Sequence, residues 1–249
     1  MNCPRAKQQK IMSRPLNILK TVVAIAVFSI LTSCCDEDPG PIQETRKEYA
    51  LVDFDRLEMG SAFNIEVEQG NAFSVKVKGD RRNIDDLNVY KNGNTLVAEF
   101  DDDDGNRRHD TYIYITMPSL KGVNFSGASV SKIRGFESED ALDFYLSGAS
   151  ISQLDASYRE VDIVVSGASS LVFFGSGDQF HAEISGASIF KAFDYPVREA
   201  MIDISGASEG KVAVTDELKV TAGGASSLLY RGNPSVTSNT SGASTVQKD

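Results

Sequence analysis

The chain has no tryptophan and only 2 histidines and 3 cysteines among its 249 residues. So few histidines and cysteines leave little material for a metal centre or an activated nucleophile. Positive charge is also scarce, since 25 Lys and Arg stand against 35 Asp and Glu. A chain with a net charge of −10 repels a phosphate backbone, which argues against nucleic acid as a partner. We therefore expect no metal, no cofactor and no catalytic residues.

Long apolar runs are absent as well. The apolar stretch at residues 21–31 is too short for a membrane-spanning helix, which needs ~20 residues. It follows the basic residues 1–20, in the order that is typical of a secretory signal peptide. Leu31-Thr32-Ser33-Cys34 then resembles the bacterial lipobox, whose cysteine becomes the lipidated N-terminus. We expect a signal peptide over residues 1–33 and a lipid on Cys34 that attaches the protein to a membrane. The alternative is an ordinary signal peptide followed by a chance cysteine.

Residues 34–48 are rich in charge and contain Pro39-Gly40-Pro41, which predicts an acidic tether before the folded part. The run Asp36-Glu37-Asp38 resembles signals that send some Gram-negative lipoproteins to the cell surface. It is equally consistent with a solvated linker. We expect a protein anchored by lipid in the outer membrane, either exposed on the surface or facing the periplasm.

The second half of the chain is repetitive. The tripeptide Gly-Ala-Ser occurs seven times, and successive glycines are 18 to 21 residues apart. Such a fixed period is the signature of a solenoid. Apolar residues stand six, four and two positions before five of these glycines, as in Leu142, Phe144 and Leu146. A second apolar row stands six positions after each glycine and consists of Ile133, Leu154, Phe173, Ala192, Val212 and Tyr230. This alternation indicates strands with one face buried.

One such unit cannot bury enough surface to offset the entropy of ordering ~19 residues. Stacking equivalent strands pairs their backbones and covers each inner row, which predicts an all-β, single-stranded parallel β-helix over residues 121–249. We expect a right-handed coil, because parallel crossovers favour that hand and no six-residue period is present. Residues 49–120 also alternate, with an Asn92-Gly93 hairpin turn. They form either irregular first coils or a β cap over the N-terminal end of the helix.

The glycine of each tripeptide suits a tight corner between strands. Its serine stacks on the serine of the next coil, which predicts a row of hydroxyl groups along one edge. The motif either forms only a corner or presents a ligand-facing ladder that binds glycans weakly and multivalently. The members of this ladder are Ser129, Ser150, Ser169, Ser188, Ser208 and Ser226.

The repeated Ser-Gly-Ala-Ser coils, the stretch Gly60–Gly70 and the Gly79-Asp80 pair resemble the family of putative auto-transporter adhesins with a head GIN domain. The resemblance covers about residues 50–245. It implies a β-helix similar to pectin-lyase-like folds, on secreted or lipid-anchored envelope proteins. It brings no catalytic residues.

Other candidate chemistry is sparse. Asp101-Asp102-Asp103-Asp104 either attracts Ca²⁺ or forms a solvated hairpin tip, and it lacks the alternating acids of an EF-hand. His181 beside Glu183, with Asp162 one coil earlier, is either a general base or part of a solvated sheet face. Five loop aromatics either stack on sugar rings or pack the loops, namely Phe136, Tyr158, Phe174, Tyr195 and Tyr230.

Together these features predict a lipid-anchored envelope β-helix that is not an enzyme and acts as an adhesin or surface scaffold. Its partners would be surface glycans or other envelope proteins. One alternative is a carbohydrate-binding or polysaccharide-cleaving module of the outer membrane. Another is a scaffold inside the envelope that faces the periplasm.

Overall fold

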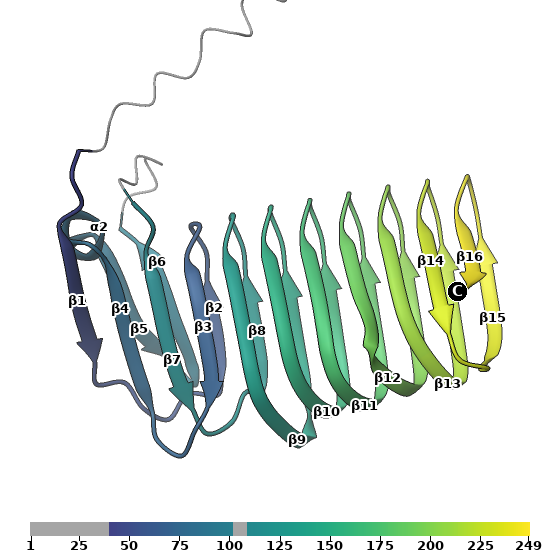
Figure 1. Cartoon of the computed structure of the whole chain (residues 1–249), viewed down its shortest axis with the longest axis horizontal. Coiled ribbons are helices and arrows are strands. Elements are labelled where there is room, and N and C mark those ends of the chain that lie inside the picture. Colours follow the sequence, from purple (N-terminus) through teal and green to yellow (C-terminus); the bar gives the residue numbers. More distant parts are fainter. Residues whose placement is uncertain (1–39, 102–108) are drawn as a thin grey trace, which may run out of the picture. The chain divides into compact units, whose positions relative to one another are not determined.

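The computed structural model describes residues 40–101 and 109–249. The signal peptide predicted over residues 1–33 and the lipidation site predicted at Cys34 lie outside the described residues. Residues 41–249 form one compact unit. No helix in this described part has the length and hydropathy needed to cross a membrane. Nearly all of the regular structure is β-strand, and a single sheet of 16 strands runs through the unit (Figure 1).

The repeats stack as a parallel β-helix, which confirms the predicted fold class. Each long strand runs from one Gly-Ala-Ser corner to the next, and neighbouring coils pair in parallel, with Ile151 between Val130 and Ser170. The corners lie along one edge of the unit, at the top of Figure 1. The strands of this region are β8 (Gly122–Phe125), β9 (Val130–Leu146), β10 (Ile151–Val165), β11 (Ser170–Ile184), β12 (Ile189–Ile204), β13 (Glu209–Ala222), β14 (Ser227–Arg231), β15 (Ser235–Thr240) and β16 (Thr245–Lys248).

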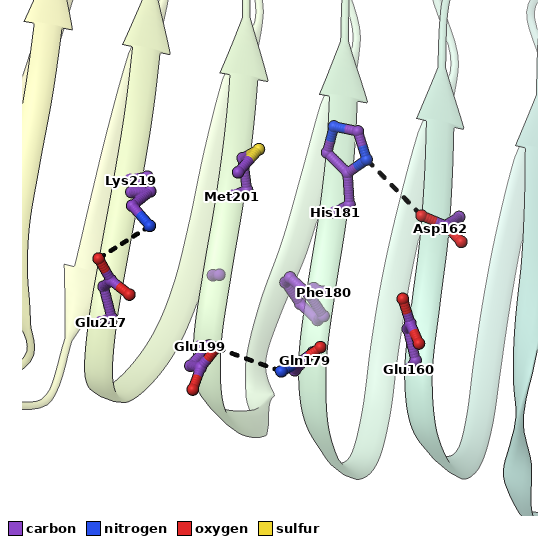
Figure 2. Close-up of a pocket in the computed structure, with 10 residues that line it drawn as sticks. Glu160, Asp162, Gln179, Phe180, His181, Glu199, Met201, Glu217 and Lys219 are labelled. Carbon is purple, nitrogen blue, oxygen red and sulfur yellow. Dashed lines mark hydrogen bonds and ion pairs between the residues drawn. The ribbon is translucent and has the colours of Figure 1, made fainter.

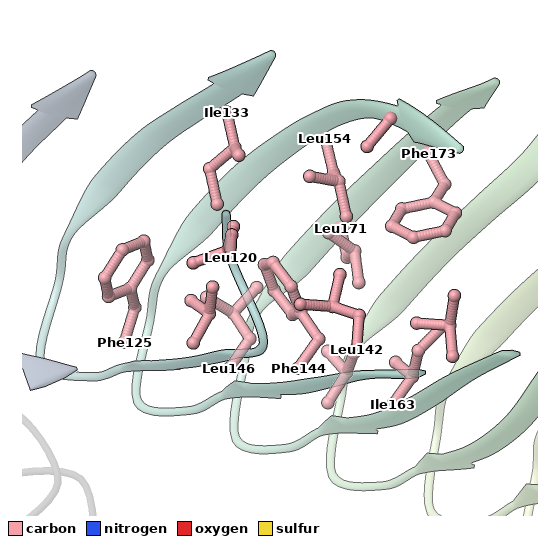
Figure 3. Packing of buried hydrophobic residues seen from close by; sticks show 14 of the residues in the cluster. Leu120, Phe125, Ile133, Leu142, Phe144, Leu146, Leu154, Ile163, Leu171 and Phe173 are labelled. Atoms are coloured by element: carbon pink, nitrogen blue, oxygen red, sulfur yellow. The ribbon is translucent and has the colours of Figure 1, made fainter. Parts of the chain in front are cut away.

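Each coil contributes to two walls. The post-corner wall contains the residues that follow each corner, such as 130–134 and 151–155. The pre-corner wall contains the residues that precede it, such as 142–146 and 161–165. Side chains of the two walls point into a shared interior, as Leu154 and Phe144 do from opposite walls in Figure 3. Both predicted inner rows are buried, except that Tyr230 is only partly covered.

The corners explain why glycine recurs. Gly148 has φ +77°, a left-handed conformation that residues with a Cβ adopt only at a cost. A Cβ added to Gly148 would fall on the carbonyl oxygen of Gly127 in the coil before. The ladder of hydrogen bonds continues through the corner, since the Ala149 amide donates to that same oxygen at 2.8 Å. Both the backbone conformation and the close stacking therefore require glycine.

The region over residues 49–120 contains coils and a cap. β2 (Arg56–Met59) and β3 (Asn64–Gln69) form one coil around the corner Gly60–Phe63, and they pair in parallel with β8 and β9. A second coil consists of β6 (Thr95–Phe100) and β7 (Tyr112–Met117), which lie on the other side of β2 and β3. The β2–β3 coil comes first in the chain, yet it lies between the other two.

Antiparallel strands and a short helix cover the N-terminal end of the β-helix. β1 (Glu44–Tyr49) pairs with β4 (Ser74–Asp80), β4 pairs with β7, and β5 (Leu87–Asn92) pairs with β6. The helix α2 (Arg81–Asp85) is N-capped by the buried Asp80, which accepts from the Arg82 and Gln43 amides at 2.9 Å. The Arg82 guanidinium, followed by these amides, lowers the pKa of Asp80 far below its usual range.

The predicted tether over residues 34–48 extends too far. Residues 44–48 belong to β1, which pairs with β4 along its full length. Only Thr45 and Tyr49 of this strand are partly buried, so its sequence carries almost no apolar alternation. The charged side chains that suggested a linker instead lie on an edge strand, where charge is common.

Candidate functional site

The predicted ligand-facing serine row lies inside the protein. Its six hydroxyl-bearing residues are at most 2% exposed. The expectation that they meet a ligand is therefore wrong, and the alternative reading of the motif as a corner is the one that fits. The physical reason is the alternation of the strand: each serine stands four residues before an inward aliphatic or aromatic side chain, as Ser150 does before Leu154, so it shares the same inward face.

These serines close the corners from within. Ser150 Oγ donates to the Ser147 carbonyl at 2.8 Å and accepts from Ser129 Oγ at 3.1 Å. Ser226 Oγ likewise donates to the Gly223 carbonyl at 2.9 Å. Small side chains with one hydroxyl fit the narrow corner and satisfy polar groups that would otherwise be buried without a partner. The row therefore stabilises the fold and is not open to a ligand.

The post-corner wall carries an exposed apolar stripe directly beside the corners. Val130, Ile151 and Ile189 are 46%, 54% and 36% exposed. They stand in register on three of four stacked coils, because Ser170 occupies the equivalent position between Ile151 and Ile189. We call these three residues the apolar stripe. Large aliphatic side chains gathered in line on a surface are typical of a contact site for another macromolecule.

The pre-corner wall has a different chemistry. Its outward positions on β9–β13 carry one lysine, Lys219, and seven carboxylates. A shallow hollow of about 230 Å³ lies between β10 and β13 and is lined by His181, Met201 and several of these acids (Figure 2). The seven carboxylates are Asp143, Glu160, Asp162, Glu183, Glu199, Asp203 and Glu217.

His181 lies on the outer face of the pre-corner wall and approaches only one carboxylate, Asp162, closely enough to form an ion pair in the described residues. Its Nδ1 lies 3.6 Å from Asp162 Oδ1, and both side chains are almost half exposed, so water screens their interaction. Glu217 pairs with Lys219 at 3.0 Å, and Glu199 accepts from Gln179 at 3.2 Å. Glycoside hydrolases place two carboxylates on opposite sides of the bond they cleave, whereas these acids stand side by side on one flat wall. In the described ranges, no group of three or more His, Cys, Asp and Glu side chains is arranged to hold a metal ion.

The loop aromatics divide into two groups. Phe136, Tyr158 and Tyr195 are buried, while Phe174 and Tyr230 are partly covered. Tyr158 donates its hydroxyl to the Leu120 carbonyl at 2.7 Å, and Tyr195 donates to the Tyr158 carbonyl at 3.2 Å. Burial raises the pKa of Tyr195 to about 12. Three of the five predicted sugar-stacking candidates are thus core residues that fill the bend opposite the corners.

Most of the acidic tip lies outside the described residues, which resume at His109. Asp101, at its start, is exposed and accepts from Asn88 Nδ2. The His109 carbonyl accepts from Asn83 Nδ2 at 2.7 Å. In the sequence this segment lies between β6, which ends at Phe100, and β7, which begins at Tyr112. The Ca²⁺ expectation for residues 101–104 stays untested.

The stacked coils, the packed interior and the two broad outer walls define a β-helix protein. The model of the family described as "putative auto-transporter adhesin, head GIN domain" matches residues 53–234, and the chain belongs to this family.

Several solved structures are similar. A "putative adhesin" from Bacteroides fragilis has 18% identity and a TM-score of 0.75, over 83% of this chain and 97% of the other. One from Parabacteroides merdae has 16% identity and a TM-score of 0.62, over 83% and 96%. A "putative lipid binding protein" from Parabacteroides distasonis has 21% identity and a TM-score of 0.57, over 83% and 96%. These likenesses support the fold. No curated protein matches the chain.

Proposed function

We propose that the protein is a lipid-anchored adhesin or surface scaffold of the bacterial envelope and that it is not an enzyme. The family and the β-helix fold support a surface role. The lipobox-like Leu31-Thr32-Ser33-Cys34 supports the anchor. The observation that carries the proposal is the apolar stripe, which lies exposed on a rigid wall while the interior is fully packed.

The stripe suits adhesion for a physical reason. Its side chains project from paired strands, so binding them freezes little backbone motion and costs little conformational entropy. Neighbouring coils are ~4.8 Å apart. Val130 and Ile151 are therefore adjacent contacts, and Ile189 adds a third contact two coils beyond Ile151. Each contact is weak alone, but many copies on one cell would bind a surface together, and this multivalency raises the overall avidity.

The contact surface is tested with beads that carry purified residues 41–249. Beads with the wild type should bind cells of the source organism or a panel of immobilised glycans. The variant Ile151→Asp with Ile189→Asp should lose most of this binding. The variant Tyr145→Asp with Met201→Asp is the matched control, because these residues are 46% and 47% exposed on the opposite wall and two charges are introduced there as well. Equal binding by all three proteins would contradict adhesion through the stripe.

The anchor is tested in cells fed a labelled fatty acid. The wild type should incorporate the label, and Cys34→Ala should not. Protease treatment of intact cells then separates a surface position from a periplasmic one, because only a surface domain is digested. An unlabelled wild type would contradict the lipid anchor, and a fully protected domain would contradict adhesion to other cells while leaving an internal scaffold as the role.

A carbohydrate-binding role is a second candidate, and the hollow around His181 is the feature that favours it. Carboxylates and an imidazole in a shallow depression are suitable partners for sugar hydroxyls. Glycan-array binding that is lost in His181→Ala and retained in the stripe variant would support this function. Turnover of a polysaccharide by the wild type and not by His181→Ala would point to cleavage.

A further inference from the structure

The coil formed by β15 and β16 has an open edge. Among the described strands, β15 pairs only with β13, and β16 pairs only with β14. The long strands β9–β13 have partners on both sides. The Ser241 amide donates to Ala222 at 2.9 Å, which fixes the alternation along β15. By that alternation the N–H and C=O groups of Val236, Ser238 and Thr240 point to the open side.

The β15 part of this edge lacks the features that usually protect an edge strand, and a charge occurs only at the end of β16, at Lys248. Natural proteins block such edges with charged residues, proline, bulges or an inward-pointing charge. Residues 235–246 contain no charge and no proline. The inner row of the coil is also uncovered: Val236 is 38% exposed, and Ser238 and Thr240 are exposed as well. The edge is therefore chemically ready to pair with another strand.

The opposite end of the unit is closed to such pairing. β1 carries Glu44, Arg46, Lys47 and Glu48 along six residues. Glu44 pairs with Lys78 at 3.1 Å, and Glu48 with Lys76 at 3.3 Å. Stacking the open end of one copy on the closed end of another would desolvate these ion pairs without replacing them. Head-to-tail growth into a fibre is therefore disfavoured, and the partner that matches the open edge in length and chemistry is the same edge of a second copy.

We propose that two copies of this chain associate end to end through their β15–β16 coils, related by a two-fold axis. When this two-fold axis is perpendicular to the walls, β15 pairs antiparallel with β15 of the second copy. In the same way, β16 pairs antiparallel with β16 of the second copy. The pairing satisfies the open backbone groups and covers both inner rows. The inference goes beyond the proposed function and does not depend on it, because neither the anchor nor the apolar stripe takes part.

Sedimentation equilibrium of purified residues 41–249 tests this pairing, since this compact unit contains the whole described core. The wild type should form a dimer, with a concentration dependence in the micromolar range. Ser238→Lys places a charge on the inner row and should weaken association by about tenfold or more. Thr237→Lys is the matched control, because the same charge on the same strand points outward and should leave the dimer intact.

A second variant separates edge pairing from misfolding. Ser238→Pro removes an N–H that faces the open side and has no partner within the coil, so the fold should survive while the dimer is lost. Unchanged far-ultraviolet circular dichroism would verify the fold of each variant. A wild type that stays monomeric up to ~100 µM, or a dimer that resists both substitutions at Ser238, would overturn the proposal.

Discussion

The corner glycines yield the sharpest test of how this fold is held together, and Gly167→Ala is the most informative substitution. Gly167 has φ +76° and lies in a central coil. A Cβ at this position would fall on the carbonyl oxygen of Gly148. The obstacle is backbone and not the end of a flexible side chain, so the corner itself has to shift.

Two costs add in this variant. Alanine in the left-handed region costs about 1–2 kcal/mol. Forcing the methyl group into the stacked corner costs about 1–3 kcal/mol more, because it displaces the Ala168 amide from its 2.8 Å bond to Gly148. We expect a total loss of about 2–5 kcal/mol in the free energy of unfolding. In a unit of this size that lowers Tm by roughly 5–20 °C.

Urea denaturation followed by far-ultraviolet circular dichroism measures the loss, and the chain contains a matched control. Gly93 also has positive φ, at +61°, but a Cβ there would meet nothing within 4 Å. Gly93→Ala should therefore lose only the backbone cost, about 1–2 kcal/mol. If Gly167→Ala is no more destabilising than Gly93→Ala, the argument that stacking itself demands glycine is refuted.

Four further outcomes follow from the interior. Ser150→Ala should cost about 1–3 kcal/mol in a urea titration and leave bead binding unchanged, because its hydroxyl is buried. Phe180→Ala should cost about 3–5 kcal/mol by the same measurement, since the ring packs 5.7 Å from Phe190. Asp80→Asn should lower the free energy of unfolding by about 2–3 kcal/mol at neutral pH. Because the pKa of Asp80 is lowered in the folded protein, the difference between wild type and variant should be complete above about pH 4 and should shrink in urea titrations at lower pH. Burial raises the pKa of Tyr195 to about 12, so the wild type should lose stability as the pH rises above about 10. The free energy of unfolding of Tyr195→Phe should depend less on pH in this range.

The sequence alone predicts the repeated part of this fold because two periods coincide there. The spacing of the glycines sets the coil length, and the alternation around them sets which side chains face inward. Both predicted inner rows are buried apart from the partly covered Tyr230, and the corners stack in register through hydrogen bonds such as that from the Ala168 amide to the Gly148 carbonyl. The family is confirmed by the match over residues 53–234.

The corner serines are the part of the repeat for which the sequence prediction was wrong. The row six positions after each glycine faces inward, and counting back by two reaches first Ser152 and then Ser150. The period of a strand therefore already places the corner serine inside, and polarity alone suggested an exposed face. Polar residues are buried here because each hydroxyl has a partner one coil away or within its own corner.

The N-terminal region resists prediction for a different reason. The coil of β2 and β3 lies between two coils that follow it in the chain, so sequence order and spatial order differ. Its corner has Ser61 and Ala62 at positive φ in place of glycine, with φ values of 62° and 59°. Neither the position of this coil between two later coils nor its altered corner leaves a signal in the local sequence. The contacts with the stacked neighbouring coils hold this backbone conformation in place.

The same alternation that buries the core frees the outer walls to change. Inward positions are fixed by their neighbours one coil away, so Ile163 and Val165 tolerate little change in volume. Outward neighbours such as Ile151 contact almost nothing inside, and changing them should cost within about 0.5 kcal/mol. A β-helix can therefore alter what it binds without altering how it folds. The contrast between an apolar stripe on one wall and seven carboxylates on the other therefore requires no compensation in the core, and this independence suits the contact role proposed for the stripe.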